Sequence, residues 1–437
     1  MKNACAPFEA KKITLLGLGL LGRGAGDAEF LAECGARLLV TDKKSETELA
    51  ENVARLKKFP NVEFHLGGHR IEDFTSADLV IKAAGVPLDS PEIAAARKAG
   101  VQVAMSTALF AKSAMEIGAR IVGVTGTRGK STVSQMIFHS LPLAGKKVLL
   151  GGNVRGVSTL AMLPDVTPET IVVLELDSWQ LQGFGDLKIS PHISIFTNLM
   201  PDHQNYYPDM QAYFSDKANI FRFQNSGDSL FVGESIFEKI EAAQPKVAPR
   251  IPDSIPADWK LKIIGAHNRE NASLAAAALR PLGLSEKEIR DGIESFEAVE
   301  GRLQFVREVN GVKIYNDNNA TTPEATIAAL RALDQGKQNI HLIAGGSDKG
   351  LDLSELVGEI ERTCEDIYLL GGTGTVRLQK ELPAAKIFSS LEDAFEAAIA
   401  STDEGDIILF SPAFASFGMF RNEYERGDEF LRLVRAL

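Results

Sequence analysis

The chain has 437 residues, of which 45% are hydrophobic and 24% charged, a composition typical of a soluble globular protein with an ample core and, at about 150 residues per domain, two to four domains. Its net charge of −11 argues against a nucleic-acid partner, because neutralising phosphates requires a basic face, and no apolar segment is long enough to suggest a signal peptide or membrane insertion. The three cysteines, Cys5, Cys34 and Cys364, have no close spacing, so we expect neither a disulfide framework nor a structural zinc site, and we expect a reducing cytoplasm as the location.

Short apolar runs alternate with helical stretches along the first 115 residues. The runs at 13–19, 36–42 and 79–85 predict strands of a parallel α/β unit. The first run continues into GLGLLG (17–22, the glycine loop), and Asp42 follows Gly19 by 23 residues, which is the pattern of a dinucleotide-binding fingerprint. Glycines at such a turn let backbone N–H groups approach a pyrophosphate. Taken alone, the pattern is compatible with NAD as well as with a UDP-sugar.

The same alternation continues through two further units. Strands are expected at 119–126, 148–153, 170–176 and 192–199, with an Ala-rich helix at 271–280, and then at 311–317, 339–346, 366–372 and 406–412. We therefore predict an α/β protein with three domains, at residues 1–115, 116–300 and 301–437.

The segment GVTGTRGKST (123–132, the phosphate loop) is the strongest single signal. It lies where a strand turns into a helix, so its N–H groups can converge on a phosphate and the helix dipole adds positive potential. Lys130 would reach the terminal phosphates of a nucleotide, and the Ser131 hydroxyl would bind Mg²⁺. Val124 stands where the common P-loop pattern has a glycine. The alternative interpretation is an ordinary glycine-rich turn.

Polar residues follow the next strands of this second unit. Glu175 ends a predicted strand, where a carboxylate faces the ligand crevice of an open α/β sheet and can hold Mg²⁺. Asp202 and His203 follow the next strand, and Lys217 comes fourteen residues later. Each also has an ordinary explanation: a cap or surface charge for the acid, a structural role for the histidine, and a solvated surface position for the lysine.

These segments together resemble the Mur ligases. TGTRGKS, ELDSWQL (175–181), the Asp202–His203 pair and AYFSDKANIF (212–221) occur in the family's order and spacing, and folylpolyglutamate synthetases share this central plan. Further matching segments are GAHNRENASLAAA (265–277), GRLQFV (301–306), YNDNNATTPEAT (315–326), AGGSDKG (344–350) and SPAFASFGMFRNEYERG (411–427). The resemblance covers essentially the whole chain. It implies a Rossmann-like UDP-binding first domain, a central P-loop-type ATP-binding domain, and a Rossmann-like third domain that closes over ATP and glutamate.

The resemblance also implies roles for individual residues. The catalytic residues would be Lys130, Glu175, His203 and Lys217. Two Mg²⁺ ions would be held by Ser131, Glu175, His203 and Lys217, the last carbamylated by CO₂. ATP would be bound by Gly126, Thr127, Arg128, Gly129, Lys130, Ser131, Thr132, Asn268, Asn271, Arg302 and Asp317. The UDP substrate would be bound by Gly17, Gly19, Leu20, Leu21, Gly22, Asp42, Gly85 and Asn153, and glutamate by Thr321, Lys349 and Ser416.

The implied activity is ATP-dependent addition of D-glutamate to UDP-N-acetylmuramoyl-L-alanine through an acyl phosphate, in cytoplasmic peptidoglycan precursor synthesis by a monomer. The alternatives are another amide ligase of the superfamily, including a different Mur ligase, an L-glutamate-adding variant or a folylpolyglutamate synthetase-like enzyme, and a non-enzymatic sensor of UDP-sugars or nucleotides. The chain departs from the family in the amino-acid pocket: Asn319 stands where a lysine is usual, and Glu423, beside Tyr424, where an aromatic is usual.

Overall fold

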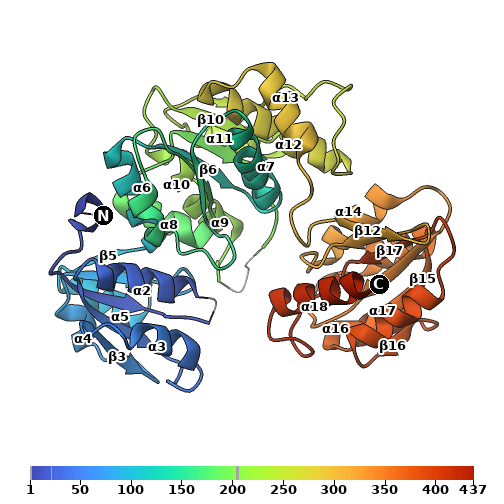
Figure 1. Cartoon of the computed structure of the whole chain (residues 1–437), viewed down its shortest axis with the longest axis horizontal. Helices are drawn as coiled ribbons and strands as arrows, with labels where there is room; N and C mark the ends of the chain where they lie inside the picture. The colour runs from blue at the N-terminus through green and yellow to red at the C-terminus, as the bar shows by residue number, and fades with distance from the viewer. Residues whose placement is uncertain (1, 21, 203–205) are drawn as a thin grey trace. The chain divides into compact units, whose positions relative to one another are not determined.

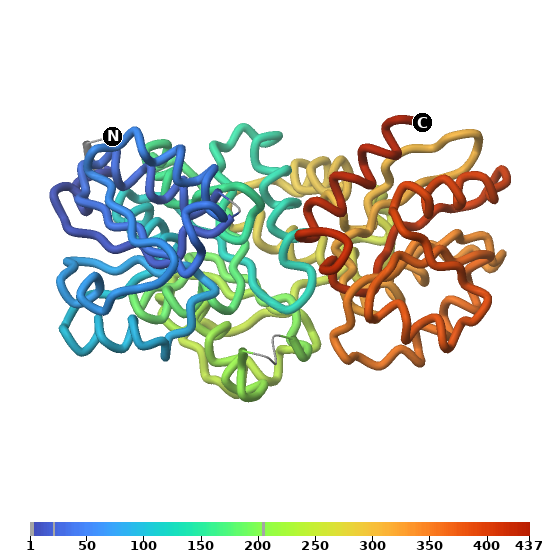
Figure 2. Tube along the Cα trace, turned by 90° about the horizontal axis from the view of Figure 1, so that it is seen from below, coloured from blue at the N-terminus to red at the C-terminus, as the bar shows by residue number. Residues whose placement is uncertain are grey.

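The computed structural model describes residues 2–20, 22–202 and 206–437, which form two compact units (Figure 1). Unit 1 comprises the chain up to Ile255 together with Asn271–Ile293, and unit 2 comprises Pro256–Glu270 and Glu294–Leu437. The colours of Figure 2 follow the same ranges, from blue to green for most of unit 1 and from orange to red for most of unit 2. Within the described ranges, no helix has both the length and the apolar character needed to cross a membrane.

The first sheet lies in unit 1 and is parallel throughout. Its strand order is β3 (Val62–Leu66), β2 (Arg37–Asp42), β1 (Lys12–Leu16), β4 (Leu79–Lys82) and β5 (Gln102–Ala104). The helices along this part of the chain are α1 (Lys2–Cys5), α2 (Arg23–Glu33), α3 (Ala50–Leu56), α4 (Glu72–Thr75) and α5 (Pro91–Lys98). The central strands are buried along almost their whole length, as expected for a parallel sheet covered on both faces.

The second sheet, also in unit 1, carries the phosphate loop. Its order is β11 (Pro249–Arg250), β10 (Ser229–Val232), β9 (Ile193–Phe196), β6 (Arg120–Thr125), β8 (Ile171–Glu175) and β7 (Val148–Gly152), all parallel. Its helical segments are α6 (Ser106–Ile117), α7 (Lys130–Leu143), η1 (Leu160–Asp165), α8 (Ser178–Leu187), α9 (Met210–Lys217), α10 (Asn219–Arg222), η2 (Glu234–Ile236), α11 (Phe237–Ala242), α12 (Ala266–Leu279), η3 (Arg280–Leu282) and α13 (Glu286–Ser295). Because β6 lies between β8 and β9, the loop after β6 is flanked by the ends of both neighbours.

The third sheet lies in unit 2. Its order is β12 (Gln304–Val309), β13 (Val312–Asn316), β17 (Ile407–Phe410), β14 (Ile340–Ala344), β15 (Cys364–Leu370) and β16 (Lys386–Phe388), with β12 antiparallel to β13 and the other pairs parallel. Its helices are α14 (Pro323–Leu333), α15 (Ser354–Thr363), α16 (Thr373–Glu381), α17 (Leu391–Ala400) and α18 (Glu423–Ala436). One apolar cluster joins the sheet to α14 and α15, and another joins it to α17 and α18.

The predicted α/β fold class and its three parallel-sheet domains are confirmed, and each predicted strand and the Ala-rich helix is present. The exact domain boundaries at 115/116 and 300/301 stay predictions. The expectation of no disulfide is wrong, because Cys5 and Cys34 form one. Cys5 ends α1 and Cys34 directly follows α2, so the fold brings together two residues that are 29 positions apart. Sequence spacing alone does not show which cysteines lie close enough in the fold to form a disulfide.

Candidate active site

The phosphate loop is shaped by two glycines that no other residue can replace without strain. Gly126 and Gly129 have φ angles of 140° and 83°, which side chains rarely adopt. A Cβ atom at Gly126 would lie 1.9 Å from the Thr197 hydroxyl oxygen, and one at Gly129 would lie 2.4 Å from Oδ1 of Asn271. The loop is therefore packed tightly on its flanks, and it leads directly into α7, whose N-terminus favours an anion.

The end of β9 holds the phosphate loop in this conformation. The Thr127 N–H donates to the Asn198 backbone oxygen and the Arg128 N–H donates to Asn198 Oδ1, both at 2.9 Å. The Thr197 hydroxyl donates to the Arg128 oxygen at 2.5 Å, and the Met200 N–H donates to the Thr127 hydroxyl at 2.9 Å. The sequence-based reasoning missed Thr197 and Asn198, although two polar residues at a strand end beside the loop are a usable signal.

Lys130 and Ser131 are the first two residues of α7. The Lys130 ammonium donates to the backbone oxygens of Gly126 and Thr127, each at 3.0 Å, so its charge lies over the loop. Ser131 is buried, as is Thr127, whereas Thr132 is partly exposed. The arrangement places a cation and a hydroxyl beside the backbone N–H groups to which a phosphate would bind.

Acidic residues lie at the ends of the neighbouring strands. Glu175 is the buried last residue of β8, and it pairs with Val124, the second residue of the phosphate-loop segment. Asp177 has a local function, because its carboxylate caps α8 in a capping box with Gln180. Asp202 lies in the described part of the segment after β9, whereas His203 lies outside the described residues.

Lys217, the last residue of α9, is buried beneath the phosphate loop with 1% of its surface exposed. Its Nζ donates to the Gly126 oxygen at 2.8 Å and to the Thr125 hydroxyl at 3.3 Å, and it lies 4.8 Å from the centre of the Tyr213 ring. Burial, and then the nearby charge of Lys130, lowers the pKa of Lys217 well below its ordinary value, against the opposing effect of Asp177, Asp202 and Glu175. The alternative of a solvated surface lysine is therefore wrong.

The glycine loop of the first sheet is held by the predicted acidic residue. Gly17, Gly19 and Gly22 have positive φ angles, and Gly22 directly precedes α2. Asp42 Oδ2 accepts from the Gly19 N–H at 3.1 Å, while Oδ1 accepts from the Lys44 N–H at 2.9 Å. Asp42 thus fixes the loop in this structure. Leu21 lies outside the described residues, and Gly85 is exposed after β4.

A pocket of 230 Å³ opens beside the glycine loop. It is lined by Gly17, Gly19 and Leu20, together with residues of the second sheet such as Gly152 and Gln180. The predicted residue Asn153 lies next to this lining, and its Oδ1 accepts from Arg23 at 3.1 Å.

Two charged residues of this pocket were missed from the sequence. Burial lowers the pKa of Lys82 to about 8, although the charges of Asp186 and Asp177 oppose the shift. Burial likewise raises the pKa of Asp27 to about 6, against its hydrogen bond with Ser158. Lys82 is the last residue of β4, and a lysine within an otherwise apolar predicted strand could have indicated a functional residue.

In unit 2, Asp317 follows β13 and is buried. Its carboxylate accepts from the Leu303 N–H at 2.9 Å and from the Ser411 hydroxyl at 2.7 Å. Burial raises the pKa of Asp317 to about 7, against these hydrogen bonds and the charge of Arg302. Arg302 Nε has no hydrogen-bond partner among the residues that the structure describes. Asn268 also belongs to unit 2, and its side chain donates to the Ile264 oxygen at 2.7 Å.

The residues expected to hold glutamate lie on loops that meet at the carboxyl ends of the third sheet. Lys349 Nζ donates to the Thr321 hydroxyl at 3.1 Å. An isolated bridge between Ser347 and Ala415 joins the loops after β14 and β17, next to the buried Ser416.

The two residues that depart from the family pattern both lie beside hydrogen bonds to neighbouring backbone. The Asn319 side chain donates to the Glu300 oxygen at 3.2 Å, and Glu423 begins α18 with its backbone oxygen accepting from Asn318 at 2.7 Å. The buried Arg426, missed from the sequence, donates to Asn318 Oδ1 at 2.8 Å and to the Phe414 oxygen at 3.2 Å. Arg426 therefore ties together the two segments that carry Thr321 and Ser416.

Comparison with known proteins places this geometry in a family. Three family models match: "Mur ligase MurD-like, N-terminal domain" over residues 11–105, "Mur ligase middle domain" over 124–247 and "Mur ligase, glutamate ligase domain" over 301–414. A protein of Roseiflexus sp. (strain RS-1) named UDP-N-acetylmuramoylalanine--D-glutamate ligase is 35% identical, with 98% of each chain covered. The chain belongs to the Mur ligase family.

Other Mur ligases with the same name have similar identity. The Borreliella burgdorferi (strain ZS7) protein is 34% identical with 97% of each chain covered, and the Treponema pallidum (strain Nichols) protein is 31% identical with 100% of each covered. Among solved structures, UDP-N-acetylmuramate-alanine ligase MurC from Thermotoga maritima has a TM-score of 0.63 at 18% identity, covering 98% of this chain and 99% of its own. FolC from E. coli has a TM-score of 0.57 at 19% identity, covering 76% and 93%. At these identities the structures support the fold alone.

Proposed function

We propose that this Mur ligase joins D-glutamate to UDP-N-acetylmuramoyl-L-alanine and converts ATP to ADP and phosphate. The relatives with this name match the chain from end to end, and the family makes the chain an ATP-dependent amide-bond-forming enzyme. The observation that carries the proposal is the phosphate loop with Lys130 above it, the buried Lys217 beneath it and Glu175 beside it. We assign the reaction to the cytoplasm and to a monomer, as the resemblance implies.

The reaction runs in two steps. A carboxylate oxygen of the muramoyl-alanine attacks the γ-phosphorus of ATP and ADP leaves, which gives an acyl phosphate. The amine of glutamate then attacks the acyl carbon, and inorganic phosphate leaves as the amide forms. The first step brings two anions together, so the loop N–H groups and Lys130 lower its barrier by neutralising the transferred phosphoryl group. The family resemblance further implies that Arg302 and Asp317 bind the ATP and that the third domain excludes water from the acyl phosphate.

The residues beside the loop fit Mg²⁺. Glu175 is a buried carboxylate at a strand end, Ser131 supplies a hydroxyl in the first turn of α7, and Asp202 is close enough to influence Lys217 electrostatically. Mg²⁺ prefers such oxygen ligands, and bound there it would neutralise charge on the phosphates. We propose Ser131, Glu175, His203 and Lys217 as the residues that hold two ions.

Lys217 suits a metal site only after modification, because an ammonium would repel Mg²⁺. We propose that its neutral amine adds to CO₂, forming an N–C bond and releasing one proton, so that a carbamate anion replaces the cation. The lowered pKa of Lys217 supplies the neutral amine that this reaction needs. The carbamate oxygens would then be ligands of the kind that Mg²⁺ prefers.

The two substrates are assigned to separate pockets. We assign the UDP group, rather than NAD, to the glycine loop and its adjoining pocket, because the chain belongs to a family of ATP-dependent ligases, whose reaction involves no hydride transfer. We assign the carboxylates of glutamate to the corner formed by Lys349, Thr321 and Ser416, where a lysine and two hydroxyls can donate.

A phosphate-release assay with each substrate omitted in turn tests the proposal. We expect release to require ATP, UDP-N-acetylmuramoyl-L-alanine and D-glutamate together. Release that instead requires a folate substrate would indicate another ligase of the superfamily. Binding of UDP-sugar and ATP without any release would favour a sensor and contradict the proposal.

A further inference from the structure

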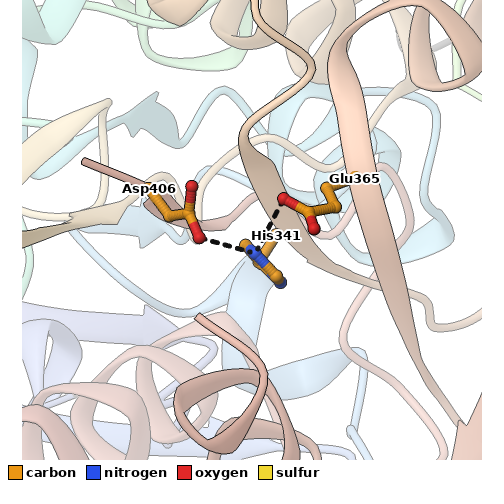
Figure 3. A group of neighbouring side chains, drawn as sticks. All are labelled: His341, Glu365 and Asp406. Atoms are coloured by element: carbon orange, nitrogen blue, oxygen red, sulfur yellow. Dashed lines mark ion pairs between the residues drawn. The ribbon is translucent and has the colours of Figure 1, made fainter. Parts of the chain in front are cut away.

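A histidine and two carboxylates meet at the amino ends of three strands of the third sheet (Figure 3). His341 is the second residue of β14, Glu365 is the second residue of β15, and Asp406 directly precedes β17. One ligand atom from each lies within 4.8 Å of the others. Asp317 and Ser416 follow the carboxyl ends of their strands, so this group lies at the other end of the sheet and is separate from the ligase site.

The imidazole of His341 is oriented with one nitrogen toward the carboxylates. The side chain is 1% exposed, and Nε2 lies 3.4 Å from Asp406 Oδ2 and 3.7 Å from Glu365 Oε2. Within the described part of the chain, Nε2 has no hydrogen-bond partner. Nδ1 lies 3.1 Å from the hydroxyl of Tyr368, which itself donates to Asp366 at 3.4 Å.

This chain of hydrogen bonds favours one tautomer of a neutral His341 imidazole. Because the Tyr368 hydroxyl gives its proton to Asp366, it accepts from His341, and Nδ1 is the nitrogen that carries the proton. The lone pair of Nε2 then points at two carboxylate oxygens. A neutral imidazole held this way is repelled by the carboxylates unless a cation lies between the three atoms, whereas an imidazole protonated at Nε2 would form an ion pair with them. Zn²⁺ binding distinguishes the two states. Histidine ligands of metals commonly donate their other N–H to an outer partner in this way.

Two of the three separations between the ligand atoms fit a metal ion, and the third is no more than 4.8 Å. An ion that binds nitrogen and oxygen at about 2.0 Å in tetrahedral geometry separates its ligand atoms by about 3.3 Å. The separations of 3.4 and 3.7 Å from Nε2 are close to this value. Asp406 Oδ2 also accepts from the Asp403 N–H at 2.7 Å, which fixes the carboxylate in place.

A β-bulge places the third residue. The register of β14 and β15 pairs Ile340 with Cys364 but His341 with Asp366, so Glu365 is an extra residue between them. Bulges re-aim side chains and are rare between parallel strands. Here the bulge lets Glu365 approach His341 although its side chain is 56% exposed, which leaves a path for solvent to the group.

We propose that His341, Glu365 and Asp406 bind a divalent transition metal of the zinc class, with water as a further ligand. A neutral imidazole and two carboxylates carry a charge of −2, which a divalent ion neutralises. The imidazole nitrogen favours such an ion over Mg²⁺. A bound ion would link β14, β15 and β17, so its function would be to stabilise unit 2 rather than to take part in ligation.

Equilibrium dialysis of the metal-stripped full-length protein against Zn²⁺, without nucleotide, tests the proposal. The catalytic site can also bind Zn²⁺, so the difference between variants is the measurement. We expect Glu365→Gln and Asp406→Asn to bind one equivalent fewer than the parent, or to bind it at least tenfold more weakly. Glu365 is exposed, so its variant is expected to fold even where a buried change does not.

Matched controls locate the ion. Glu361→Gln, an exposed carboxylate on the preceding helix, Cys364→Ser and Glu175→Gln should each retain the equivalent that Glu365→Gln loses. Zn²⁺ should also raise the melting temperature of unit 2 by several degrees in the parent and not in Glu365→Gln. The proposal would be overturned if Glu365→Gln and Asp406→Asn bound as much Zn²⁺ as the parent. It would also be overturned if Cys364→Ser lost the equivalent of Zn²⁺ that the proposal assigns to His341, Glu365 and Asp406.

Discussion

Replacing Lys130 with methionine should slow the ligase strongly while leaving it folded. A unit charge about 4 Å from a phosphoryl oxygen contributes about 4 kcal/mol at the effective dielectric of a protein surface. In the resting structure the ammonium donates to two loop oxygens, and exchanging those hydrogen bonds for the phosphate costs about 1 kcal/mol each. The net loss is therefore between about 2 and 4 kcal/mol, or roughly thirtyfold to a thousandfold in kcat/KM.

The assay is steady-state phosphate release at varied ATP, with the melting temperature measured in parallel. Lys130→Met retains the aliphatic part of the side chain, so the melting temperature should fall by only a few degrees. Lys146→Met is the matched control, because Lys146 is exposed beyond the other end of α7 and should leave kcat/KM unchanged. Turnover by a folded Lys130→Met protein within threefold of the parent would refute the electrostatic argument.

Three further predictions follow from the geometry. Lys217→Ala should lose at least about a hundredfold in activity, as expected for an essential ligand when two metal ions share the reaction. Short carboxylic acids should restore part of this activity. An alanine variant as active as the parent would exclude the carbamate. Gly126→Ala should destabilise unit 1 by at least about 2 kcal/mol. Gly145 also has a positive φ, but the space around its Cβ position is open, so Gly145→Ala should cost only about 1 kcal/mol. Equal chemical-denaturation midpoints for the two variants would contradict the packing argument. Because burial raises the folded pKa of Asp317 to about 7, the neutral carboxyl favours folding below pH 3.8, and this stabilisation, up to roughly 4 kcal/mol, should be lost as the pH rises through 7. Melting curves from pH 4 to 8 should be flatter for Asp317→Asn, and an identical pH dependence would reject the shift.

The fold was predictable where strands are buried on both faces. The segments that form β1, β2, β6, β8 and β14 are largely apolar along their length, and this pattern can be recognised from the sequence alone. The sequence-based reasoning missed six strands that lie toward sheet edges and are short or incompletely buried, namely β3, β5, β10, β11, β12 and β16. The antiparallel pairing of β12 with β13 was missed with them.

The site was predictable where a motif fixes several residues at once. The phosphate loop, Glu175 and Lys217 lie together in the structure, and their roles stay predictions; the motif did not show that Lys217 would be buried. Contacts between distant segments were not predictable, because spacing does not encode which strand ends meet. The bonds from Asn198 to the phosphate loop, the links made by Arg426 and the Cys5–Cys34 disulfide are of this kind.

Mass spectrometry of the product is the measurement that tests the central claim most directly. UDP-N-acetylmuramoyl-L-alanine, ATP and Mg²⁺ are incubated with the full-length protein and one amino acid at a time, including D-glutamate, L-glutamate, D-aspartate and L-alanine. We predict a product heavier by one glutamate minus one water with D-glutamate alone, together with one ADP for each amide formed. A product with another amino acid in preference to D-glutamate, or ATP hydrolysis without any amide, would contradict the account.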